Sequence, residues 1–79
     1  MSDVPEEEKM PEELKKLNAI ASDMKLDQKI RVQAINLLGN MQSREALLAL
    51  LALAANEKLS NNDRDLALKR ARDIIKTGR

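Results

Sequence analysis

Apolar residues recur at intervals of three or four in four segments of the chain, which is the spacing of one face of an α-helix. The first segment follows Pro11, and the acids Glu12 and Glu13 suit a first turn, so we predict a helix over about 11–23. The second follows the predicted N-cap Asp27 and ends at Gly39–Asn40, a pair typical of helix C-termini. The apolar stripes of these two helices are Leu14, Leu17, Ala21 and Met24, and Ile30, Ala34, Leu37, Leu38 and Met41.

The C-terminal half of the chain predicts two further helices. Ser43 is a suitable N-cap for a helix over about 44–56. Ser60, Asn61 or Asn62 caps the last helix, which ends near Gly78. Its inward positions are expected to be Leu66, Ala67, Ala71, Ile74 and Ile75. Short loops between the helices favour antiparallel neighbours, so we expect an all-α fold, a four-helix bundle.

The two halves of the chain repeat each other. A shift of 33 residues without a gap lays 14–46 on 47–79 and gives eight identities, where this composition gives roughly three by chance. Each unit is a hairpin of two helices, which buries its apolar face only against another unit. We predict one domain over 11–79 made of two αα-hairpins, with repeat 1 at about 14–46 and repeat 2 at about 47–79. A frayed acidic segment over 1–10 precedes it.

The second predicted helix resembles the second helix of a HEAT repeat. In that family this helix often opens with an acid, then has an apolar residue, Arg, two variable positions and Ala, and ends in an apolar–Gly pair. The matching residues are Asp27, Ile30, Arg31, Ala34, Leu38 and Gly39; the second copy keeps Arg64 and Ala67 but has Asp63 and Arg72 in place of Ile30 and Gly39. The chain also resembles small uncharacterised archaeal proteins built from two helical hairpins. Both resemblances imply a scaffold that binds other macromolecules, either as a closed bundle or as an open superhelix.

The composition removes most catalytic chemistry. The chain has no Cys, no His and no aromatic residue, and its only glycines, Gly39 and Gly78, cannot form a glycine-rich phosphate loop. We therefore expect no enzyme, no cofactor and no metal site. The net charge of +1 gives no overall attraction to nucleic acid or to membranes. Because the longest apolar run, 46–55, is too short to span a bilayer, we expect a soluble cytoplasmic protein.

The helix predicted over 44–56 is the main candidate for function. Its sequence ALLALLALAA is apolar on every face, whereas a surface helix normally keeps a polar side. One interpretation is a central helix flanked by the other three, with small alanines facing outward. The other is an exposed apolar stripe that a protein partner or a second copy covers, formed by Leu48, Leu51, Ala52 and Ala55.

Basic residues of the last predicted helix give a second candidate. Lys69, Arg72 and Lys76 share one side of this helix and would suit the phosphates of a nucleic acid. Asp65 and Asp73 lie four residues from Lys69 and partly neutralise the stripe, and cations near a helix C-terminus also complement its dipole. A solvated face is therefore the simpler interpretation, and we expect nucleic acid to be an unlikely partner.

Two arginines occupy equivalent positions in the repeats. Arg31 and Arg64 stand early in matching helices. We expect them to pair with Asp23, Asp27 or Asp63 and to order the hairpin turns, which is a structural role.

Overall fold

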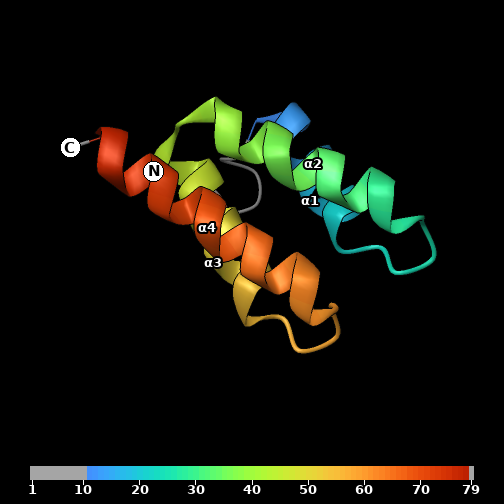
Figure 1. Cartoon of the computed structure of the whole chain (residues 1–79). Helices are drawn as coiled ribbons and strands as arrows, with labels where there is room; N and C mark the ends of the chain where they lie inside the picture. The colour runs from blue at the N-terminus through green and yellow to red at the C-terminus, as the bar shows by residue number, and fades with distance from the viewer. Residues whose placement is uncertain (1–10, 79) are drawn as a thin grey trace, which may run out of the picture.

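The computed structural model describes residues 11–78, and these form four α-helices without a strand (Figure 1). The helices are α1 (Glu12–Ala21), α2 (Gln28–Met41), α3 (Arg44–Ala55) and α4 (Asn61–Gly78). The prediction of an all-α four-helix fold is confirmed. The frayed segment predicted over 1–10 lies outside the described residues.

The helices form two antiparallel hairpins, α1–α2 and α3–α4, that lie side by side. In Figure 1, α2 and α4 form the front layer and α1 and α3 the layer behind, and both hairpin turns lie on the right. The central helix α2 packs against α1, α3 and α4, whereas α1 meets α3 over a smaller area. The shortest extent of the molecule is 19 Å, which matches two layers of helices about 10 Å thick each.

The core lies between the two hairpins and consists of leucine, isoleucine and alanine. Its largest fully buried apolar side chains are Leu14, Ile35, Leu38 and Leu50. Alanines fill many of the other buried positions of α2, α3 and α4, namely Ala34, Ala46, Ala49, Ala67 and Ala71. Because alanine occupies little volume, it allows these helices to approach one another closely. The core residue Ile35 was missing from the apolar stripe predicted for α2.

The end of α1 differs from the prediction. The helix ends at Ala21, and Ser22 is its C-cap, with its hydroxyl donating to the Asn18 carbonyl over 3.0 Å. The Asp23 N–H then donates to the Ile20 carbonyl over 3.2 Å, which turns the chain toward α2. Met24 lies in this turn and is exposed, so its assignment to the buried stripe of α1 was wrong.

Gly39 does not end α2, contrary to the prediction. The helix continues to Met41, and Gln42 forms the left-handed C-cap with φ of 54°. Gly39 is buried where the hairpins cross, and a Cβ atom there would overlap the Arg70 guanidinium. Gly39 thus leaves space for the Arg70 side chain of α4 and does not mark the helix end.

Three more residues assigned to apolar stripes are exposed. Ile30 and Leu37 on α2 and Ile75 on α4 were expected to face the core, and all three face outward. Each hairpin is covered by the other hairpin on one side only, so helical spacing alone places too many residues in the core.

The two hairpin turns use the same hydrogen bonds at a spacing of 33 residues. The side chains of Asp23 and Asn56 each accept the N–H group two residues later, over 3.0 and 2.9 Å. Their carbonyls each accept the N–H group three residues later, over 3.1 Å in both cases. Of the three caps considered for α4, Ser60 is the one used, because its hydroxyl accepts the Asp63 N–H over 3.2 Å.

Candidate interaction surface

The candidate residues on α3 all lie on its exposed face. Leu48 is 47% exposed and Leu51 is 38% exposed, and Ala52 and Ala55 are exposed beside them. We call these four residues the α3 stripe. The opposite face of the same helix is the core, with Ala46, Ala49, Leu50 and Leu53 buried. The helix is flanked by α1, α2 and α4, as one interpretation expected, but two leucines face outward in addition to the alanines.

The orientation of the α3 stripe follows from the start and the packing of the helix. Ser43 caps α3 with its hydroxyl, which accepts the Ala46 N–H over 3.0 Å. Burial of the opposite face then fixes the rotation of the helix about its axis. The stripe is thus a preformed surface, bounded by the exposed side chains of Glu45 before it and Lys58 after it.

A second apolar surface, which sequence reasoning missed, is a groove between α1 and α2 with a volume of about 450 Å³. Its lining residues are Glu13, Lys16, Leu17, Leu37, Asn40 and Met41. The repeat contains a signal for it, since the shift of 33 residues lays Leu37 on Arg70 and Met41 on Ile74. Ile74 is buried and Arg70 contacts α2, whereas of their counterparts Leu37 is exposed and Met41 is only partly buried.

The three basic residues predicted on α4 are brought together on its outer face. Lys69, Arg72 and Lys76 are all exposed, and within residues 11–78 no ion pair involves them. The sequence suggested that Asp73 partly neutralises Lys69. In the structure Asp73 instead pairs with Arg70 over 3.2 Å. The basic residues therefore form a solvated face that keeps its positive charge.

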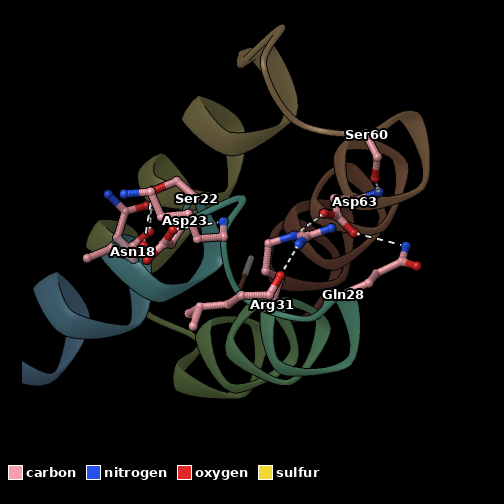
Figure 2. A network of polar contacts seen from close by, with 10 residues as sticks. Asn18, Ser22, Asp23, Gln28, Arg31, Ser60 and Asp63 are labelled. Atoms are coloured by element: carbon pink, nitrogen blue, oxygen red, sulfur yellow. Dashed lines mark hydrogen bonds and ion pairs between the residues drawn. The ribbon is translucent and has the colours of Figure 1, made fainter.

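The most buried polar group links the two hairpins (Figure 2). Arg31 reaches from α2 to Asp63 on α4, where its Nε lies 2.7 Å from Oδ2, and the two side chains are 7% and 0% exposed. Gln28 donates to the other Asp63 oxygen over 3.3 Å, and Arg31 Nη1 donates to the Leu26 carbonyl over 2.5 Å. Of the three acids considered for Arg31, the structure selects Asp63. Because both carboxylate oxygens accept hydrogen bonds, this network stabilises the junction of the hairpins.

Arg64 has a different role from its repeat counterpart Arg31. Its Nε donates to the Ala54 carbonyl over 2.9 Å, which ties α4 to the last turn of α3. The prediction that Arg64 pairs with an acid was wrong, since its partner among the described residues is this carbonyl. The bond satisfies a carbonyl at a helix C-terminus, where the usual intrahelical donor is missing.

Other kinds of site find no support in the described part of the chain. Residues 11–78 contain no group of three or more potential metal-binding side chains. None of their helices combines the length and apolar character needed to cross a bilayer. The chain matches no protein-family model, no curated protein and no solved structure.

Proposed function

We propose that this protein is a non-enzymatic protein-interaction module that docks a protein partner or a second copy through the α3 stripe. The observation that carries the proposal is the exposure of Leu48 and Leu51 beside two alanines on a helix whose other face is the core. Covering apolar surface contributes about 25 cal/mol per Å², so these side chains favour association.

The rigidity of α3 also supports the proposal. The helix is capped by Ser43, and its buried face packs against three other helices. A surface that is already ordered loses little conformational entropy when a partner binds.

Site-specific photo-crosslinking in the native host tests this function. A benzophenone amino acid is placed at Leu48, and a matched control carries it at Ile75, which is 58% exposed on α4. We expect a crosslinked protein product from position 48 that is absent from position 75, and we expect Leu51→Glu to abolish it. Leu51 is 38% exposed, so this change should alter the free energy of unfolding by no more than about 1 kcal/mol.

Two results would contradict the proposed function. One is the same set of products from positions 48 and 75, which would show collision and not docking. The other is a product from position 48 that persists with Leu51→Glu in a chain whose helical circular dichroism is unchanged.

A second candidate function is contact with nucleic acid through the exposed residues Lys69, Arg72 and Lys76. It is favoured by their shared face and by their freedom from ion pairs among the residues that the structure describes. Binding to duplex DNA or RNA should then weaken steeply with salt and be lost when all three residues are changed to Ala. Lys25→Ala in the first hairpin turn is the control. No binding at low salt would exclude this function.

A further inference from the structure

We propose that the partner of the α3 stripe is the α3 stripe of a second copy, bound antiparallel about a twofold axis between Leu51 and Ala52. This inference rests on the proposed function, because it uses the same surface and names what covers it. It follows from three features of the stripe: the order of large and small residues, the charges at its two ends, and its size.

The order of large and small side chains makes the stripe complementary to an antiparallel second copy of itself. Both leucines lie in its N-terminal half and both alanines in its C-terminal half. In an antiparallel pair with the axis between Leu51 and Ala52, Leu51 faces Ala52 of the second copy, and Leu48 faces Ala55. Each large side chain then meets a small one, which lets two helices approach closely without a void or a clash. A parallel pair would instead place leucine against leucine at one end and alanine against alanine at the other.

The charged residues at the two ends of the stripe fit the same twofold arrangement. Glu45 lies in the first turn of α3, and Lys58 lies in the turn that directly follows the end of α3, so an antiparallel pair brings Glu45 to the end of the second copy that carries Lys58. Both side chains are exposed, and neither takes part in an ion pair within residues 11–78. The backbone of Lys58 is held in place, because its N–H donates to Asn56 Oδ1 over 2.9 Å. The symmetry forms this ion pair twice, as an isologous interface requires.

The size of the stripe sets the strength of the dimer. A helix of 12 residues is about 18 Å long, so two crossed copies bury less area than the roughly 1,200–2,000 Å² of a standard interface. We therefore expect a reversible dimer with a dissociation constant in the micromolar range or weaker. Such a dimer can also exchange its second copy for another helix with the same surface.

Charge reversal tests the register of the dimer. Association is measured by analytical ultracentrifugation from about 10 µM to about 1 mM protein. Glu45→Lys and Lys58→Glu each place like charges opposite one another at two points, and each should raise the dissociation constant by about tenfold. The double variant with both changes restores opposite charges and should return the dissociation constant to within about twofold of the original.

The repeat provides matched controls for these variants. Glu12 and Lys25 are the counterparts of Glu45 and Lys58 in the first hairpin, and both are exposed. Glu12→Lys and Lys25→Glu change the net charge of the chain by the same amounts but lie outside the stripe. We expect them to leave the dissociation constant unchanged.

Each outcome separates this inference from the proposed function. A strict monomer up to about 1 mM overturns the second copy as partner, whereas the function stands if position 48 still crosslinks to a different protein. A dimer that Leu51→Glu abolishes but that the double charge reversal does not restore overturns the antiparallel register alone. If neither Leu51→Glu nor the single charge reversals weaken the dimer, the two copies meet through a surface other than the α3 stripe, and the inference is overturned.

Discussion

Replacing Asp63 by alanine removes the carboxylate that faces Arg31 and leaves the guanidinium at the junction of the two hairpins. In the native protein, Arg31 Nε lies 2.7 Å from Asp63 Oδ2, and the two side chains are 7% and 0% exposed. The guanidinium keeps one hydrogen bond, to the Leu26 carbonyl, and the Gln28 amide loses its partner on Asp63. A buried charge without its counter-charge is the main cost of this substitution.

The expected loss is large compared with the stability of so small a domain. Breaking a buried ion pair by removing one partner costs about 3–5 kcal/mol. Asp63 lies in the first turn of α4, where the interaction of an acid with the helix dipole stabilises the fold by a further amount of about 0.3–1 kcal/mol. A chain of 79 residues has a free energy of unfolding of roughly 4–12 kcal/mol. Asp63→Ala should therefore remove a quarter or more of the total and unfold a large part of a marginal protein.

Urea unfolding followed by circular dichroism at the helical band measures this loss. With a slope of about 1 kcal/mol per M, the midpoint should fall by about 3 M or more. Asp65→Ala is the control, because Asp65 is an exposed acid on the same helix, and it should cost less than about 0.5 kcal/mol. The double variant Arg31→Met with Asp63→Leu removes both charges and should regain most of the loss. A loss below about 1 kcal/mol for Asp63→Ala would refute the buried pair as the polar link between the hairpins.

Three further substitutions test other parts of the structure. Gly39→Ala should bring no gain in stability in the native chain, because its Cβ displaces the Arg70 guanidinium. In an Arg70→Ala variant the same change should stabilise the fold by up to about 1 kcal/mol. A double-mutant cycle from urea unfolding measures the difference, and equal effects in both backgrounds would contradict the contact between Gly39 and Arg70. Ser43→Ala removes the cap of α3 and should cost about 1 kcal/mol, so an unchanged melting temperature would argue against that cap. Leu50→Ala empties a fully buried position and should lower the free energy of unfolding by about 2–5 kcal/mol. Leu51→Ala, on the exposed face of the same helix, should lower it by less than about 1 kcal/mol. Equal losses for the two variants would show that α3 is rotated differently about its axis.

The helices themselves could be predicted from local features of the chain. Apolar residues at helical spacing, together with Ser43 and Ser60 as caps, locate the starts of α3 and α4. Capping and spacing depend on residues within one or two turns, so they act in any tertiary context. The same reasoning identified the α3 stripe, because the apolar residues of α3 outnumber the positions that one core face can bury.

The partners of individual side chains were decided by the tertiary structure. Asp23, Asp27 and Asp63 were equal candidates for Arg31, and only the packing of α4 against α2 brings Asp63 within hydrogen-bond distance. Gly39 has the sequence context of a helix end, yet its role comes from Arg70, which is 31 residues away in the chain. Sequence spacing contains no information about which helix crosses above a given residue.

Local periodicity therefore determines which residues share a face, and the stacking of the hairpins determines which faces are covered. Ile30, Leu37 and Ile75 follow the helical pattern as well as Leu38 and Ile74 do, but the first three side chains are exposed and the other two are buried. The physical reason is range: hydrogen bonds and apolar spacing along one helix involve residues a few positions apart. Burial instead depends on contacts between segments that are distant in the chain.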